Sequence, residues 1–153
     1  MLKAGVFGAG HLGKIHLKLL QQSSEYELIG FYDGDKQRAK EIEDEFGYKS
    51  FDSAEALIEA VDMIDVVTPT ITHFETAKKA ITAGKHLFVE KPITSTYEEA
   101  EELISLAKKH KVKGQVGHVE RFNPAFTAVK DKIGQPMFIE AHRLAEFNPR
   151  GTD

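Results

Sequence analysis

The sequence contains no cysteine and no tryptophan among its 153 residues. Without cysteine the chain has no disulfide, no thiolate metal ligand and no cysteine nucleophile. Its uninterrupted apolar runs fall far short of the ~18 residues that a membrane-spanning helix needs. No apolar segment of the secretory type follows Met1. These absences predict a protein that does not bind membranes and that works in a reduced, cytoplasmic setting.

The sequence also has no excess of positive charge. Lysine and arginine number 20 against 24 aspartates and glutamates, which gives a formal charge of −4. A chain without surplus basic residues has little with which to neutralise phosphates, so we do not expect a nucleic-acid partner. The hydrophobic share of 41% and the charged share of 29% are those of an ordinary globular protein. The length favours about one domain.

Short apolar runs alternate with amphipathic segments along most of the chain. The runs predict strands at residues 2–7, 27–32, 48–51, 63–68, 86–90 and 112–119. The segments between them predict helices at residues 12–22 and 36–46, one starting at Asp52 or Ser53, and two more at 72–83 and 95–111, with capping boxes Thr72–Glu75 and Ser95–Glu98. Strands separated by helices indicate an α/β fold with a doubly wound parallel sheet of the Rossmann type, in the order 3-2-1-4-5-6. Ligands of such sheets bind at the carboxyl ends of the strands.

The alternation stops near residue 122. Residues 124–133 predict a short helix, and residues 137–144 predict a strand that no crossover follows. We interpret this strand as the first of a truncated second domain. The sequence therefore predicts a dinucleotide-binding domain over residues 1–122. Residues 123–153 would be a connecting helix and the first strand of a C-terminal substrate domain that the chain lacks.

A glycine-rich turn follows the first predicted strand and opens the first helix. It reads Gly8-Ala9-Gly10-His11-Leu12-Gly13, a G-x-G-x-x-G pattern. Gly8 allows the tight turn, Gly10 lets the backbone approach a pyrophosphate, and Gly13 lets the helix pack closely. The amides of His11, Leu12 and Gly13 then point at the phosphates. The alternative is a tight turn that binds nothing.

An acidic residue ends the second predicted strand. Asp33 follows Gly13 by 20 residues, the place of a carboxylate that accepts hydrogen bonds from the adenosine ribose. A carboxylate there repels a 2′-phosphate, which favours NAD over NADP. Arg38 argues the other way, because a nearby arginine can bind that phosphate. The alternative for Asp33 is a simple turn residue in Asp33-Gly34-Asp35.

Polar residues also follow the fourth and fifth predicted strands. The hydroxyls and imidazole of Thr68-Pro69-Thr70 and His73 can reach the nicotinamide ribose, although the threonines can equally cap a helix and His73 can lie on the surface. Glu90 and Lys91, in Glu90-Lys91-Pro92, are candidates for binding the cofactor at its nicotinamide end, and the Lys91 ammonium can bond a reacting hydroxyl or relay a proton. The alternative for Lys91 is an ordinary solvated lysine at a strand end.

Two residues at the end of the sixth predicted strand are candidates for substrate binding, His118 within it and Arg121 just beyond it. Arg121 can hold an anionic group, or it can pair with Glu120 instead. His118 can titrate near neutral pH. We predict no metal site, because no third ligand has a suitable spacing.

Taken together, these motifs resemble the N-terminal half of the glucose–fructose oxidoreductase / inositol dehydrogenase (Gfo/Idh/MocA) family. The motifs are the turn at 8–13, Asp33, Thr68-Pro69 with His73, the run at 84–92 that ends in Glu-Lys-Pro, and residues 117–124. The resemblance implies an NAD(P)-dependent oxidoreductase of sugars or sugar derivatives in which Lys91 is catalytic and touches the nicotinamide ribose. It also implies a missing C-terminal domain that supplies the substrate pocket and a possible homo-oligomer interface.

Two details refine the resemblance. Thr70 stands where the family often has asparagine, which puts its nicotinamide-ribose contact in question. The segment at 117–124 is similar to that of members acting on nucleotide-linked amino sugars.

We therefore predict the cofactor-binding portion of a sugar dehydrogenase that is inactive on its own, with a small sugar-type molecule as substrate. One alternative is a free-standing nucleotide-binding module without catalysis, and the length of the source gene would separate the two. Another is a different adenosine ligand, such as a flavin or S-adenosylmethionine. The Glu-Lys-Pro setting of Lys91 does not suit that ligand.

Overall fold

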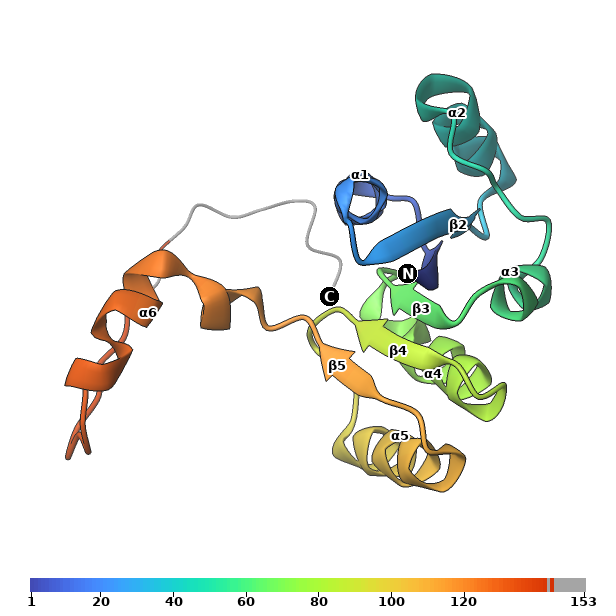
Figure 1. The fold of residues 1–153 in the computed structure, drawn as a ribbon. Helices are drawn as coiled ribbons and strands as arrows, with labels where there is room; N and C mark the ends of the chain where they lie inside the picture. The colour runs from blue at the N-terminus through green and yellow to red at the C-terminus, as the bar shows by residue number, and fades with distance from the viewer. Residues whose placement is uncertain (143, 145–153) are drawn as a thin grey trace. The chain divides into compact units, whose positions relative to one another are not determined.

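The computed structural model describes residues 1–142 and 144 of the chain (Figure 1). The chain divides into two compact units, Met1–Gly117 and His118–Asp153. The first unit carries every predicted site residue except His118 and Arg121. The assignment of cofactor binding to the first part of the chain and of the start of a substrate domain to the second stays a prediction.

The first unit alternates strands and helices largely as the sequence predicts. Its elements are β1 (Leu2–Phe7), α1 (His11–Gln22), β2 (Tyr26–Tyr32), α2 (Lys36–Phe46), α3 (Ala54–Ala60), β3 (Met63–Val66), α4 (His73–Thr82), β4 (His86–Val89), α5 (Tyr97–His110) and β5 (Gly114–Val116). However, α3 follows α2 with no strand between them, and the predicted strand at 112–119 is confirmed only over residues 114–116. A 3₁₀ turn at Thr70–Thr72 precedes α4. The five strands form one parallel sheet in the order β2-β1-β3-β4-β5. This is a Rossmann-like α/β fold.

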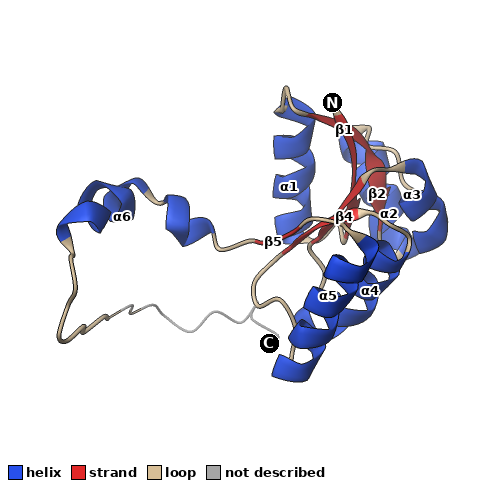
Figure 2. Ribbon diagram, turned by 60° about the horizontal axis from the view of Figure 1, so that its bottom comes forward, coloured by secondary structure: helices blue, strands red, loops and turns tan. Residues whose placement is uncertain are grey.

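Helices cover both faces of this sheet, which buries apolar side chains on each (Figure 2). On one face α1 and α2 pack Leu17, Ala39 and Ile42 against Val6 and Phe31. On the other face α3, α4 and α5 form a larger core around Leu57, Ile64, Ala80, Ile81 and Leu103. The near-continuous apolar strands of the sequence are thus explained by burial on both sides.

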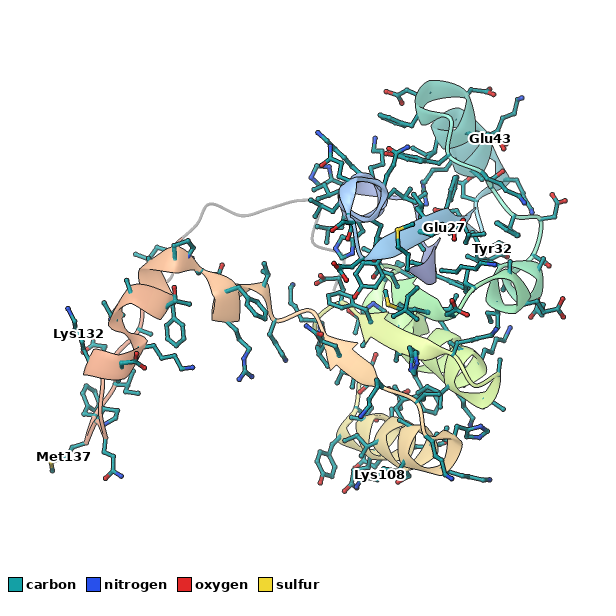
Figure 3. The ribbon with its side chains drawn as sticks, in the orientation of Figure 1. Glu27, Tyr32, Glu43, Lys108, Lys132 and Met137 are labelled. Atoms are coloured by element: carbon teal, nitrogen blue, oxygen red, sulfur yellow. The ribbon has the colours of Figure 1, made fainter. Side chains whose placement is uncertain are left out.

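The predicted third strand, residues 48–51, is wrong as a full strand. It meets β2 only through the isolated parallel bridge between Phe31 and Ser50. Two backbone hydrogen bonds make this bridge, from the Phe31 amide to Lys49 and from the Phe51 amide to Phe31, both 2.9 Å. Glu43 of α2, labelled in Figure 3, accepts a 2.9 Å hydrogen bond from the Ser50 hydroxyl. With so short a pairing the sheet has five strands rather than six.

Two predicted helix starts also differ from the structure. The capping box of α5 is formed by Thr96 and Glu99, one residue later than the predicted pair at 95 and 98. Thr72 makes no side-chain cap at the start of α4, because its hydroxyl lies 2.8 Å from both the Thr68 hydroxyl and the Pro69 carbonyl oxygen. By contrast α2 spans the predicted residues, capped by the Asp35 side chain and ended by Gly47 in the left-handed conformation.

The second unit contains a 3₁₀ turn at Val119–Phe122, α6 (Pro124–Val129) and a further 3₁₀ turn at Lys130–Lys132. The Asn123 side chain caps α6 by accepting from the Ala125 amide at 2.9 Å. The predicted helix at 124–133 is therefore confirmed as α6 followed by a tighter turn. The predicted strand at 137–144 is wrong for its described residues, 137–142 and 144, which form no strand. Its residue 143 and the predicted tail at 148–153 lie outside the described residues.

Over the described ranges, no helix has both the length and the apolar character needed to cross a membrane.

Candidate functional site

The register of the sheet brings the carboxyl ends of four strands together. Phe7 of β1 lies opposite Tyr32 of β2 and Val66 of β3, and Val66 lies opposite Val89 of β4. The segments that follow these strands therefore begin side by side. They contain the glycine turn, Asp33, Thr68 and the Glu90-Lys91 pair, so the fold gathers these predicted residues at one edge.

The glycine turn packs tightly against its neighbours at two positions. Gly8 has a φ of 91°, a conformation that side chains disfavour. Its amide donates to the Tyr32 carbonyl oxygen at 2.9 Å. A Cβ atom on Gly8 would lie 2.8 Å from the Val67 carbonyl oxygen, and one on Gly13 would collide with the Gly8 carbonyl oxygen. Only glycine at both places lets α1 begin directly over the end of β1.

Gly10, in contrast, faces open space. Within the described residues no atom lies within 4 Å of the place its Cβ would take. Gly10 precedes α1, whose first turn offers the backbone amides of His11, Leu12 and Gly13 and contains no acidic side chain. An anion at this point gains from the free amides and from the helix dipole. The turn thus fits the pyrophosphate of a dinucleotide.

Asp33 is buried, with 6% of its surface exposed. Its Oδ2 accepts from the Ala9 amide at 2.8 Å and its Oδ1 accepts from the Asp35 amide at 2.9 Å. Arg38 Nη1 lies 3.3 Å from both oxygens, and Arg38 Nη2 lies 3.3 Å from Asp35 Oδ2. The carboxylate therefore ties the glycine turn to the end of β2.

These contacts fill the acceptor positions of Asp33 and bear on how a ribose would bind. The arginine is the partner that can leave, because its side chain is 47% exposed, whereas the two amides belong to the backbone. Displacement of Arg38 would free Asp33 to accept from ribose hydroxyls, and an arginine beside this carboxylate can bind a 2′-phosphate. The predicted roles of Asp33 and Arg38 stay predictions that are compatible with this geometry.

His73 lies in a different environment from that predicted. It is 1% exposed, and its ring nitrogens lie 2.9 Å from the Pro92 carbonyl oxygen and 2.8 Å from the Thr68 carbonyl oxygen. The ring therefore fastens the loop after β3 to the loop after β4. Thr68 and Thr70 are half-buried and Pro69 is exposed. A cofactor contact by any of these four residues stays a prediction.

Lys91 is exposed at the end of β4, and a cis peptide bond joins it to Pro92. Its backbone amide donates to Glu90 Oε2 at 3.1 Å. In the described part of the chain its ammonium pairs with no carboxylate, which leaves it available to a ligand. Glu90 is half-buried because the other side of its carboxylate faces α1.

The residue that Glu90 faces is His16, to which the sequence analysis assigned no role. His16 Nε2 lies 3.5 Å from Glu90 Oε1, and His16 Nδ1 lies 2.8 Å from Asp65 Oδ2. Asp65 is 3% exposed, in the middle of β3. An aspartate inside a short apolar strand is a signal that could have found this cluster, because buried carboxylates are almost always paired.

Burial by itself lowers the pKa of His16. The hydrogen bond to Asp65 and the charges of Asp65 and Glu90 outweigh that effect, so the pKa of His16 is raised above its ordinary value. Burial also raises the pKa of the Asp65 carboxyl. Both shifts mean that the pair holds its proton more tightly than separate groups would.

His118 and Arg121 belong to the second unit and are exposed. There Glu120 accepts a 2.8 Å hydrogen bond from the Asn123 side chain. The substrate roles of His118 and Arg121 stay predictions. Over the described ranges, no group of three His, Asp or Glu side chains is arranged to hold a metal ion.

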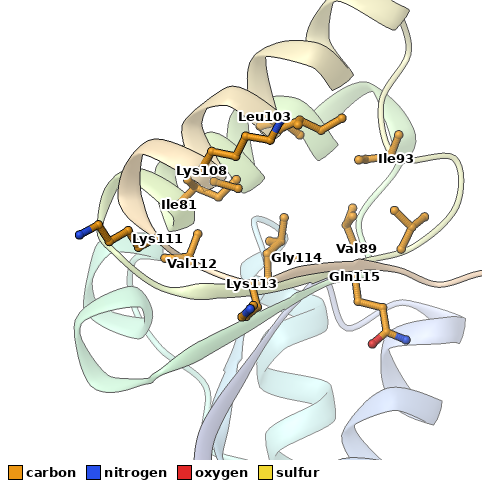
Figure 4. A pocket seen from close by; sticks show the side chains of 14 residues that line it. Ile81, Val89, Ile93, Leu103, Lys108, Lys111, Val112, Lys113, Gly114 and Gln115 are labelled. Carbon is orange, nitrogen blue, oxygen red and sulfur yellow. The ribbon is translucent and has the colours of Figure 1, made fainter.

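An apolar hollow of about 560 Å³ opens between α5 and the β4–β5 edge of the sheet (Figure 4). Leu103, Val89 and Val112 line it, and Lys108 and Lys111 lie on its rim. None of the predicted site residues is among the described residues that line it, so it is separate from the strand-end site.

Residues 2–118 match the family described as "Oxidoreductase family, NAD-binding Rossmann fold", Gfo/Idh/MocA. The chain belongs to this family. The match covers more than half of the sequence and coincides with the first unit, which is therefore the N-terminal NAD-binding domain of a Gfo/Idh/MocA protein. The resemblance drawn from the motifs is confirmed.

Several relatives are sugar dehydrogenases. The chain is 39% identical to the UDP-N-acetylglucosamine 3-dehydrogenase of Acidithiobacillus ferrooxidans, over 99% of this chain and 48% of that one. It is 35% identical to scyllo-inositol 2-dehydrogenase (NAD(+)) of Bacillus subtilis, over 91% and 43% respectively. It is 31% identical to glucose-6-phosphate 3-dehydrogenase of the same organism, over 93% and 42%. The chain thus spans about half the length of these relatives.

Solved structures of similar proteins support the assignment of the chain to this family. A structure of the Acidithiobacillus ferrooxidans UDP-N-acetylglucosamine 3-dehydrogenase superposes with a TM-score of 0.89 at 38% identity, covering 99% of this chain and 50% of that one. An NAD-binding protein from Listeria innocua gives a TM-score of 0.80 at 28% identity, over 86% and 40%.

Proposed function

We propose that this chain binds NAD at the strand-end site and forms the cofactor-binding portion of a dehydrogenase of sugars or sugar derivatives. The observation that carries the proposal is the pairing of an open helix start at Gly10 with the buried Asp33 carboxylate, tied to it through Ala9. The first suits a pyrophosphate and the second a ribose. Family membership supports a nicotinamide dinucleotide as the ligand.

NAD is the preferred form in this proposal. Asp33 repels a 2′-phosphate, and Asp35 adds negative charge beside it. Arg38 offers some compensation, which is why NADP is the weaker ligand rather than an excluded one. The relative from Bacillus subtilis that is named for NAD(+) supports the same order.

Lys91 is the catalytic residue in this proposal. The bound nicotinamide would exchange a hydride with a carbon of the substrate. When the substrate is oxidised, Lys91 as a neutral amine would take the proton from the hydroxyl on that carbon, and in the reverse direction the Lys91 ammonium would donate a hydrogen bond to the carbonyl oxygen and return the proton to it. Its exposure at the end of β4 and its unpaired ammonium within the described residues support this role. His73 keeps the neighbouring loops in place through the Thr68 and Pro92 carbonyl groups.

The substrate class that we favour is a nucleotide-linked amino sugar. Similarity to an enzyme named UDP-N-acetylglucosamine 3-dehydrogenase, over almost all of this chain, supports it. We propose that the substrate is contacted by His118 and Arg121, and that Arg121 binds an anionic group of the substrate. Because the chain spans about half of that relative, we expect cofactor binding with little or no turnover.

Titration calorimetry of the full chain with NAD⁺ and NADP⁺ at neutral pH tests the proposal. We expect saturable binding of both with NAD⁺ tighter, and a loss of that preference in Asp33→Asn. A Lys91→Gln variant should keep the affinity for the adenosine half, measured with ADP-ribose. No binding of either dinucleotide at millimolar concentration would overturn the proposal.

A further inference from the structure

Three polar side chains meet between α1 and the sheet, and two of them, His16 and Asp65, are not among the predicted cofactor-binding residues. Asp65 comes from β3, His16 from α1, and Glu90 from the end of β4. Their side chains are 4%, 16% and 16% exposed. Burying three ionisable groups costs free energy of desolvation unless they form hydrogen bonds or ion pairs with one another, so the cluster needs a physical explanation.

We propose that His16 is a positioning residue: held by Asp65, it fixes the Glu90 carboxylate, which in turn fixes the backbone of Lys91, so that the nicotinamide end of the site responds to pH. The link to the cofactor rests on the proposed function. The link from His16 to Lys91 rests on the contacts of the chain alone.

The contacts form a continuous chain of polar atoms. His16 Nδ1 lies 2.8 Å from Asp65 Oδ2 and His16 Nε2 lies 3.5 Å from Glu90 Oε1, while Glu90 Oε2 accepts the Lys91 amide at 3.1 Å. Ionised carboxylates only accept hydrogen bonds, so both ring nitrogens of His16 are best matched when both carry protons. One carboxylate thus connects the imidazolium to the residue proposed to be catalytic.

The surroundings leave Glu90 little room to choose another position. A Cβ on Gly117 would lie only 2.6 Å from Glu90 Oε1, so the backbone of β5's end closes that side. The Phe88 ring packs against the His16 ring at 5.9 Å, with the planes at 61°. The carboxylate is therefore confined between the imidazole, an aromatic ring and a glycine backbone.

Loss of the proton changes the balance of charge in this space. The charged groups that act on His16 are Asp65 from β3 and Glu90 after β4, and the Lys14 ammonium on its own helix is directed at the Phe46 ring, 5.9 Å away. Asp65 Oδ1 has no hydrogen-bond partner among the described residues, so the hydrogen bond from Asp65 Oδ2 to His16 is the main contact that stabilises this carboxylate. When His16 becomes neutral, two carboxylates repel each other and Glu90 is released from α1.

Nuclear magnetic resonance of the full chain without cofactor tests the relay directly. The His16 ring carbon and the Lys91 backbone amide are followed between pH 5.5 and 9. We expect both signals to shift with one midpoint, above the value of about 6.5 for a free histidine. In Asp65→Asn the midpoint should fall, and in His16→Gln the Lys91 shift should disappear. A Lys91 amide that does not follow the His16 midpoint in the unaltered chain overturns the proposal, even if neither variant folds.

His110→Gln is the matched control, because it removes a histidine at the end of α5, outside the cluster. It should leave the Lys91 titration unchanged, and a changed titration there would contradict the specific link through His16.

The consequence for the cofactor is measured by NADH fluorescence over the same pH range. Affinity should weaken about fivefold as pH rises through the His16 midpoint, the effect of losing about one hydrogen bond. In His16→Gln affinity should be the same at every pH. If NADH fails to bind at any pH the proposed function fails, while the resonance experiment still decides the relay. Binding that is independent of pH in the unaltered chain contradicts the link to the cofactor.

Discussion

The two halves of the strand-end site hold their carboxylates in different ways. At the ends of β1 and β2, Asp33 is fixed by two backbone amides and by Arg38, which keeps its charge at all physiological pH values. Inside β3 and just after β4, Asp65 and Glu90 are contacted by His16, whose charge depends on pH. The same fold therefore gives one half a permanent counter-charge and the other a titratable one.

The two halves also differ in how exposed their positively charged side chain is. The cation of the first half is 47% exposed and free to leave, whereas that of the second half is 16% exposed and packed under Phe88. We therefore expect a bound ligand to displace the Arg38 side chain. We expect the contacts of His16 to change with the protonation of its ring instead. Four changes would break or sharpen this contrast.

The largest effect is expected from Gly13→Ala in the first half. Its Cβ would collide with the Gly8 carbonyl oxygen, so α1 must move away from the turn. We expect a loss of about 3 kcal/mol of stability and no measurable NAD⁺ binding by calorimetry. Gly10→Ala is the matched control, since its Cβ enters open space and should weaken binding without lowering the melting temperature. Equal stability of Gly13→Ala and the unaltered chain would contradict the packing argument.

The next effect is expected from Asp33→Ala. The change leaves the amides of Ala9 and Asp35 without their acceptor and removes the proposed ribose contact. NAD⁺ affinity should fall about 100-fold, as measured by calorimetry. Asp33→Asn, which keeps one acceptor oxygen, should lose less. An Asp33→Ala chain that binds NAD⁺ normally would remove Asp33 from the site.

A smaller effect concerns stability against pH in the second half. The folded pKa of His16 is raised, so its stabilisation is complete below the unfolded value of about 6.5 and is lost as pH rises through the folded value. Urea unfolding between pH 5.5 and 9 should show His16→Gln less stable at the acid end by about 1 kcal/mol, with the difference shrinking toward pH 9. A difference that grows with pH would reverse the assigned sign.

The smallest effect is expected from Arg38→Gln. The side chain is half exposed, so stability should change by less than about 0.5 kcal/mol. NADP⁺ affinity should fall several-fold because the 2′-phosphate loses its cation, while NAD⁺ affinity holds or rises as Asp33 is freed. The ratio of the two dissociation constants checks this, and an unchanged ratio would show that Arg38 does not meet the phosphate.

The first half of the site was predictable because its signals are local. The glycine turn and its spacing to Asp33 can be read along the chain, and in the second half Lys91 was a candidate from Glu90-Lys91-Pro92 before the family resemblance implied a catalytic role for it. The strand at 48–51 was overpredicted, since apolar character does not reveal how few backbone bonds a segment makes. His16 and Asp65 were missed because they lie 49 positions apart, and only the packing of α1 on β3 brings them together.

Gly117 stands at the junction of the two units. It is the last residue of the first unit, its amide donates to the Val89 carbonyl oxygen at 2.8 Å, and a Cβ there would press on Glu90. Residues from 118 onward are thus joined to the first unit at a glycine whose backbone lies against the Glu90 carboxylate. A side chain at Gly117 would therefore displace the Glu90 carboxylate, and through it the carboxylate's contact with the Lys91 backbone amide.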